Sequence, residues 1–400
     1  MRTPIFRRPL SRRLLTSALG ALMVVFSATE SAMGQTDPVY DRPFVTSAGS
    51  GSTAIGGYLE GNTNYFSEDG VSEGFSMELR RFNIFLYSKM GTRVSFISEL
   101  EFEHGTEEIA LETALIDFRL SPELSLRAGI LLPPIGLFNQ NHDSPKWEFI
   151  DRPLASTEII PSTLSEVGFG LHGHADVSGI NAAYQVYLVN GLGAGIVNNS
   201  QGRTHIPSGK SEETFEEDNN GKPSITARLE LSTPDLGKVG LSWYGGVYNN
   251  WQIEGEAVAE KRAVRLLAVD FRTEQASVTI QGEAVVAWVD VPDDLGEFFG
   301  DEQIGAFLDV SIPVHTGSIG SLEGVTVAGA LRAEYVDYNR GTFGSGSKIH
   351  DDVRALVLGL SLRPNSETIF KLNYRHHWIR DLLGNPARLG GFQVGFASYF

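Results

Sequence analysis

The clearest pattern in this chain is an alternation of apolar and polar positions over its last nine residues, 392–400. Phe392, Val394, Phe396 and Phe400 fall on one face of an extended strand, because successive side chains of a strand point to opposite sides. A last strand with an apolar face and a terminal aromatic residue is typical of a membrane-spanning β-barrel, in which that strand closes the sheet and contacts lipid. The alternative is an ordinary edge strand.

The same period of two recurs in about sixteen segments of roughly 9–13 residues, the length that a tilted strand needs to cross a bilayer. It is clearest in residues 94–102, 225–231, 276–288 and 370–378. A strand of a soluble sandwich also alternates, so the pattern in one segment does not decide between the two folds. The order of the connections between segments does.

Tight connections and longer polar connections follow one another in strict succession. We place the tight ones near residues 91–92, 121–123, 176–179, 233–237, 273–275, 313–324 and 363–367. We place the longer ones near residues 67–76, 104–108, 133–165, 190–222, 249–261, 290–303, 337–352 and 380–389. Short periplasmic turns and long outer loops are the known asymmetry of outer-membrane barrels. The sequence therefore predicts an all-β fold, an antiparallel transmembrane barrel of about 16 strands over residues 53–400.

The N-terminus predicts export from the cytoplasm. Five arginines precede an apolar run over residues 14–26, and Ala32 and Gly34 supply the small residues of a cleavage site. We interpret residues 1–34 as a secretory signal peptide and residues 35–52 as a flexible N-terminal segment. No later stretch approaches the roughly 18 apolar residues of a transmembrane helix. No large plug domain or TonB-box-like segment is evident before Thr53, which argues against an energised transporter.

Composition excludes several functions. The chain has no cysteine, so it has no disulfide, no thiolate nucleophile and no cysteine-ligated zinc. The formal net charge is −17, and loss of residues 1–34 removes five arginines and one glutamate, which makes the remainder more acidic. This charge argues against nucleic acid as a partner. We also expect no cofactor.

Acidic residues are concentrated in two of the long loops, at residues 212–218 and 290–302. Their simplest interpretation is a solvated loop surface. The alternative is that divalent cations bridge these carboxylates to lipopolysaccharide phosphates, since hard cations favour oxygen ligands. Neither loop has the spacing of a calcium-binding motif, so we predict no dedicated metal site.

The longest proline-rich connection, residues 133–165, is the candidate constriction of the pore. Its prolines break strand pairing, so it cannot extend the barrel wall. Phe138 and Trp147 are unusual in a loop surrounded by water, and they would find apolar partners if the segment folded inward against the lumen. The alternative is a loop lying over the barrel mouth. Inward folding would bring four charged side chains near the axis: Asp143, Lys146, Asp151 and Arg152.

Two short motifs resemble the phosphate-selective porin O/P-type outer-membrane porins. They are residues 79–84 (LRRFNI) and residues 126–136 (LRAGILLPPIG), and the resemblance covers roughly residues 79–173 plus the terminal strand. It implies a general or anion-preferring porin, often trimeric, whose pore is narrowed by the segment after the prolines. In outer-membrane barrels, the terminal aromatic residue, here Phe400, is known to be read by the barrel-assembly machinery.

The inferred lumen departs from the ladder of lysine and arginine found in anion-selective members. We predict that these further side chains line the pore: Arg81, Arg127, Arg228, Arg332, Lys371 and Arg375 with Glu99, Glu101, Glu230, Glu283 and Glu334. Opposite charges across a narrow pore create a transverse field that sorts solutes by size and dipole. The alternative for each charge is neutralisation by a neighbouring strand.

We therefore predict a porin of the bacterial outer membrane, a passive diffusion channel for small hydrophilic solutes or ions, with anions such as phosphate among the candidates. The expected partners are outer-membrane lipid, lipopolysaccharide, the barrel-assembly machinery and two further copies in a homotrimer. The alternative is an adhesin or structural barrel acting through its acidic loops. We do not expect an enzyme, because His172, His174, His376 and His377 lie in no recognisable serine-nucleophile motif.

Overall fold

A computed structural model describes residues 37–47, 53–72, 74–218 and 220–400 of the chain. The expected signal peptide over residues 1–34 lies outside the described residues. Within the described ranges, no helix is both long and apolar enough to cross a membrane.

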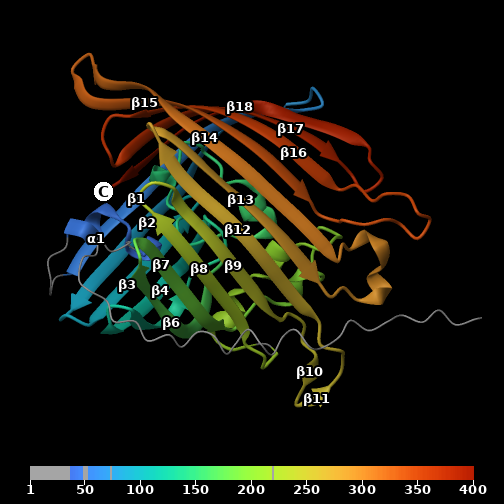
Figure 1. Ribbon diagram of the computed structural model, residues 1–400. Coiled ribbons are helices and arrows are strands. Elements are labelled where there is room, and N and C mark those ends of the chain that lie inside the picture. The colour runs from blue at the N-terminus through green and yellow to red at the C-terminus, as the bar shows by residue number, and fades with distance from the viewer. Residues whose placement is uncertain (1–36, 48–52, 73, 219) are drawn as a thin grey trace, which may run out of the picture. The chain divides into compact units, whose positions relative to one another are not determined.

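Sixteen antiparallel strands form one closed barrel, as the sequence predicted (Figure 1). Hydrogen bonds between the first strand and the last close the wall. The strands are β1 (Thr53–Glu68), β2 (Phe75–Met90), β3 (Val94–Glu103), β4 (Glu108–Ser121), β5 (Leu124–Leu131), β6 (Glu166–Val177), β7 (Ile180–Val189), β8 (Ser224–Thr233), β9 (Gly237–Val247), β12 (Ala263–Gln275), β13 (Val278–Val289), β14 (Glu302–Ile319), β15 (Leu322–Asp337), β16 (Asp352–Arg363), β17 (Thr368–Arg380) and β18 (Pro386–Tyr399). A separate two-stranded hairpin, β10 (Gln252–Ile253) and β11 (Glu256–Ala257), lies in the loop between β9 and β12.

The succession of tight turns and longer loops is confirmed, and three of its boundaries are wrong. Strand β12 continues through residue 275, and the turn lies at Ala276 and Ser277, which both adopt positive φ. The connection expected over residues 313–324 is a long hairpin in which β14 and β15 stay paired as far as residues 319 and 322. The loop expected over residues 380–389 is shorter, because β18 already begins at residue 386. In each case strand pairing extends into polar sequence.

The outer face of the wall is apolar and the inner face is polar. In β18, Phe392 and Val394 are 55% and 50% exposed, whereas Gln393 between them is 2% exposed. In β8, Leu229 and Leu231 are exposed on the outside. Because all backbone groups of a closed barrel pair with one another, such a wall needs no water on its apolar side. The outer face therefore suits a bilayer, and this band of side chains matches the alternation read from the sequence.

Short helices lie in the N-terminal segment and in the long loops. They are η1 (Pro38–Tyr40), α1 (Pro43–Ser47), η2 (Ser144–Lys146), the π-helical turn η3 (Ala155–Ile159), η4 (Ala194–Ile196), η5 (Ile206–Gly209), η6 (Glu212–Phe215) and η7 (Asp293–Phe298). A flexible segment was expected over residues 35–52. Its described part, residues 37–47, is helical over η1 and α1, and Arg42 within it is 2% exposed.

The connection between β5 and β6 folds inward, as predicted. The backbone N–H of Leu137 donates to Glu283 of β13 (2.6 Å), and that of Ile150 donates to Asn373 of β17 (2.8 Å). Phe138 packs edge-on against Phe307 of β14, with the ring centroids 5.7 Å apart. Apolar side chains of this connection and of the loop between β7 and β8 join one hydrophobic cluster with inward residues of the wall. These two connections therefore fill part of the barrel interior.

Candidate functional site

Two arginines of the inner wall form bidentate pairs with aspartates on adjacent strands. Arg127 of β5 faces its register partner Asp117 of β4, with Nε–Oδ1 and Nη2–Oδ2 distances of 2.8 and 2.7 Å. Arg332 of β15 holds Asp309 of β14 in the same way, at 2.7 and 2.8 Å. All four side chains are buried. Two parallel N–H···O bonds fix the plane of each guanidinium and neutralise it on the wall.

A third pair spans two strand spacings. Arg228 of β8 reaches over β9 to Asp270 of β12, at 2.6 and 2.8 Å, and it also donates to Glu230 (2.9 Å). Gly240 of β9 makes this reach possible, because a Cβ there would lie 2.2 Å from the Arg228 guanidinium. The sequence placed Arg228 in the lumen, and the structure adds the carboxylate that neutralises it.

The inward connection is fixed to the wall through Asp151. Its carboxylate accepts hydrogen bonds from Arg80 of β2 (2.7 Å), Arg375 of β17 (2.6 Å) and Gln393 of β18 (2.8 Å). Burial alone would raise the pKa of Asp151, but the two arginines hold it well below its ordinary value. Lys371 of β17 adds a second attachment by donating to the backbone carbonyls of residues 144 and 149, both at 2.9 Å.

A buried network joins the N-terminal segment to the inward connection. Arg42 donates to both carboxylate oxygens of Asp143, at 3.0 and 2.9 Å, and to Glu99 at 3.3 Å. Asp143 also accepts from the Tyr399 hydroxyl (2.7 Å). Burial would raise the pKa of Asp143, whereas the Arg42 guanidinium keeps it well below its ordinary value. Deprotonated Asp143 therefore stays paired over the neutral range.

Glu99, His142 and Asp143 in this network lie close enough together to offer three metal ligands. Their oxygens already accept hydrogen bonds from Arg42, whose positive charge opposes a cation at the same place. Asn83 also donates to Glu99, at 2.6 Å. The donor set therefore fits an ion-pair network better than a metal.

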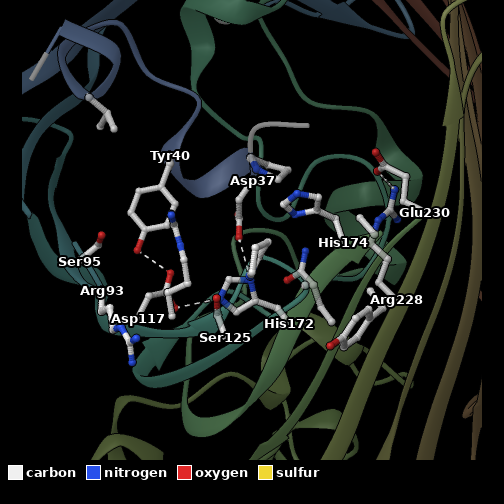
Figure 2. Close-up of a pocket in the computed structure, with 18 of the residues that line it drawn as sticks. Asp37, Tyr40, Arg93, Ser95, Asp117, Ser125, His172, His174, Arg228 and Glu230 are labelled. Atoms are coloured by element: carbon white, nitrogen blue, oxygen red, sulfur yellow. Dashed lines mark hydrogen bonds and ion pairs between the residues drawn. The ribbon is translucent and has the colours of Figure 1, made fainter. Parts of the chain in front are cut away.

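A cavity of about 470 Å³ opens near the tight-turn end of the lumen (Figure 2). Asp37 and Tyr40 of the N-terminal segment line it together with Asp117 and His172 of the wall. The Tyr40 hydroxyl donates to Asp117 (2.6 Å), and a His172 ring nitrogen lies 3.1 Å from the same carboxylate. Arg93 is an exposed cation at this end of the wall. A second cavity, of about 70 Å³, lies beside residues 146–149 of the inward connection.

The remaining predicted site residues also lie on the inner wall or on the inward connection. Glu283 accepts from the Ser156 hydroxyl (2.8 Å), and Glu334 accepts from the backbone N–H of residue 154 (3.3 Å). The other four make these contacts: Arg81 with Glu60, Glu101 and Glu103; Glu101 also with Asn83; Lys146 with Asn141; and Arg152 with Thr163. Their function in lining a pore remains a prediction.

Four functional residues were not predicted from the sequence: the counterions Asp117, Asp270 and Asp309, and Arg80. A signal for the three aspartates was present, because each is an acidic residue at an inward position between two apolar residues. Their pairing depends on strand register, which the one-strand pattern does not contain.

No family model matches the chain. It is 31% identical over 204 residues to an uncharacterized protein of Aquifex aeolicus, and the match covers 49% of this chain and 45% of that protein. The chain thus matches less than half of the relative's length.

Several solved outer-membrane proteins share the fold. OmpT of Vibrio cholerae with loop L8 deleted has a TM-score of 0.56 at 9% identity, over 88% of this chain and all of that one. The channel DcaP of Acinetobacter baumannii has a TM-score of 0.54 at 11% identity, over 87% and 97%. OprB of Pseudomonas putida has a TM-score of 0.55 at 9% identity, over 86% and 93%. Together with the apolar outer wall, this fold places the chain in the bacterial outer membrane.

Proposed function

We propose that the chain is an outer-membrane porin, a passive diffusion channel for small hydrophilic solutes and ions. The observation that carries this proposal is the contrast between the two faces of the wall, apolar outside and charged inside. A barrel of this strand number encloses more space than wall side chains fill, and the charged inner face favours water there. The inward connection leaves the cavity of about 470 Å³ at the turn end, which supports a narrow path.

Preference for anions such as phosphate is the finer proposal, and it comes from the resemblance to the porin O/P type. Arg127, Arg228 and Arg332 each hold an aspartate, so a phosphate would compete with a bound carboxylate for these guanidiniums. Within the described residues, Arg93 and Arg119 line the cavity without an ion pair. We propose that any anion preference depends on these two residues, and that sorting by size and dipole dominates elsewhere in the lumen.

The surroundings of His172, His376 and His377 support a channel better than a hydrolase. The His172 ring binds Asp117 and lies 3.7 Å from Asp37, so it is held between two carboxylates. A general base in a hydrolase would instead be held beside a nucleophilic hydroxyl. His377 faces inward near the loop end of β17, and His376 packs against Trp378 with the ring centroids 4.5 Å apart. We therefore propose no enzymatic activity.

We further propose that the barrel is a homotrimer and that its loops contact lipopolysaccharide, with divalent cations between the acidic groups and the lipid phosphates. OmpT of Vibrio cholerae, which shares the fold, has been solved in a trimer form. Recognition of Phe400 by the barrel-assembly machinery belongs to the same proposal. Chemical cross-linking in outer-membrane vesicles should give a trimer band, and a monomer band alone would contradict the trimer.

Planar-bilayer recording tests the proposed channel. The purified protein, reconstituted without its neighbours, should give stable conductance steps, and a salt gradient should give a reversal potential whose sign reports the preferred ion. Heat-denatured protein at the same concentration is the control for detergent artefacts. Silence in many independent insertions would contradict an open porin and indicate a blocked lumen, as in the adhesin or structural barrel, whose acidic loops need no open lumen.

A further inference from the structure

The N-terminal segment, residues 37–47, is attached to the inside of the barrel at three charged or polar points. Asp37 accepts from Arg127 of β5 (2.8 Å), and the Tyr40 hydroxyl donates to Asp117 of β4 (2.6 Å). Arg42 makes the two hydrogen bonds to Asp143 described above, and its side chain is 2% exposed. Arg42 also donates to Glu99 of β3 (3.3 Å), so the segment is held to the wall through Arg127, Asp117 and Glu99 and to the inward connection through Asp143.

Apolar contacts complete the fit of this segment. Phe44 stacks on Phe85 of β2, with ring centroids 5.4 Å apart and planes 20° apart, and Tyr40 packs edge-on against Tyr87 of the same strand. The Arg42 guanidinium lies 4.2 Å from the centroid of the Phe85 ring. Val39 is 1% exposed and belongs to the hydrophobic cluster of the interior. Charged and apolar side chains of the segment are therefore both matched to the inner wall.

The segment and the inward connection together bridge the lumen from one side to the other. Strands β2, β4 and β5 hold the segment, and the segment holds Asp143 of the inward connection. On the opposite side of the barrel, Glu283 of β13 accepts hydrogen bonds from the backbone N–H of Leu137 and from the Ser156 hydroxyl of the same connection. The cavity of about 470 Å³ lies against this bridge, and Asp37, Tyr40 and Val45 of the segment contribute to its lining (Figure 2).

We propose that residues 37–47 are a resident plug, and that the inner face of β2–β5 with Asp143 is the binding site for this peptide. The plug obstructs the lumen beside the inward connection, so its occupancy sets the conductance of the barrel. This inference rests on the proposed channel function. The site recognises the order of charges along the peptide. Arg127 of the wall binds a carboxylate near the N-terminal end of the peptide, and Asp143 binds a guanidinium five residues later.

The first test is deletion of residues 37–47 in the otherwise complete chain. Single-channel conductance should rise by about twofold or more relative to the wild type, because conduction increases with the open cross-section of a pore. Adding a synthetic peptide of residues 37–47 to the deletion variant should reduce the conductance again, whereas a peptide of scrambled order should not. Arg42→Gln should raise the conductance by less than the deletion does. The control is Arg340→Gln, which alters an exposed loop arginine and should leave the conductance unchanged.

A disulfide lock tests the same point without shortening the chain. An ideal Cβ on Gly56 of β1 would lie 2.8 Å from the Cβ of Phe44, closer than the roughly 3.5–4.5 Å of disulfides, so the segment must move outward by about 1 Å to accept the bond. The chain has no cysteine of its own, so a Phe44→Cys, Gly56→Cys variant forms only the designed bond. With Arg42→Gln added, the oxidised protein should conduct less than the reduced protein. The Phe44→Cys single variant should show no redox dependence.

The outcomes separate the plug from the channel. If the wild type conducts, and neither deletion nor reduction of the lock changes the conductance, the plug is refuted and the channel stands. If the wild type is silent and the deletion variant conducts, the plug is supported in its strongest form. If neither protein conducts after correct folding, the channel and the plug are both refuted.

Discussion

Replacing Arg127 by Gln should shift the ion selectivity of the channel toward cations. The change leaves Asp37 and Asp117, which both line the large cavity, without their shared guanidinium. One net negative charge at about 5 Å from a passing ion is worth about 0.8 kcal/mol in water, and about 0.5 kcal/mol after screening at 0.1 M salt. Cation permeability should rise and anion permeability should fall by about 2.3-fold each, so the permeability ratio should change about fivefold. The reversal potential in a tenfold salt gradient measures this change directly.

Arg332→Gln is the matched control for that experiment. It breaks an equally buried bidentate pair and should cost a similar folding free energy, about 3–5 kcal/mol. The carboxylate that it releases, Asp309, lines the small cavity beside residues 146–149 and not the large one. The unfolding temperature, measured by heating before gel electrophoresis, should fall by a similar amount in both variants. The reversal potential should show the larger selectivity shift only for Arg127→Gln. Equal shifts in both, or none in either folded variant, would refute a conducting path through the large cavity.

Three further predictions follow from the contacts of the inward connection, the N-terminal segment and the last strand. Asp151→Asn removes the charge that holds Arg80 and Arg375, so the unfolding temperature should fall and open-channel noise should increase; unchanged noise would argue against a fixed constriction. The lowered pKa of Asp143 means that its pair with Arg42 contributes stability above the ordinary carboxyl range and loses it only as the pH falls through the lowered value. The Asp143–Arg42 pair should therefore stay intact from about pH 7 to pH 5, so the ratio of the Arg42→Gln conductance to that of the wild type should be the same at both values, and a ratio that falls to one at pH 5 would contradict the assignment. Deleting Phe400 should lower the amount of folded barrel in the membrane more than Phe392→Ala, which alters the same lipid-facing side, and equal yields would remove Phe400 as the assembly signal.

The sequence predicted the wall because strand alternation is local. Each strand shows its inward and outward faces without reference to any other, so β18 and β8 were assigned correctly from their own residues. The turn at Ala276 was misplaced by a few residues, because a positive φ at alanine leaves no mark in composition. The inward connection was recognised because its prolines and its aromatic residues conflict with an exposed loop.

The charge network could not be predicted in the same way, because its partners are distant in sequence. Asp37 and Arg127 are 90 positions apart, and Asp151 and Arg375 are 224 apart, so only the closed barrel brings them together. The sequence is compatible both with lumen charges that face one another across the pore and with charges that neutralise one another along the wall. For Arg127 and Arg332, the structure shows neutralisation by adjacent strands.

The bidentate pairs have a consequence for how the barrel is made. Asp117 and Arg127 are only ten positions apart in the β4–β5 hairpin, and Asp309 and Arg332 are 23 apart in the β14–β15 hairpin. Each hairpin thus contains both members of its ion pair. A hairpin that inserts into the membrane therefore carries a neutral Arg–Asp pair instead of an unpaired arginine. The Asp151 attachments have no such local partner: they join β2 on one side of the β1–β18 seam to β17 and β18 on the other, so the complete set requires a closed seam.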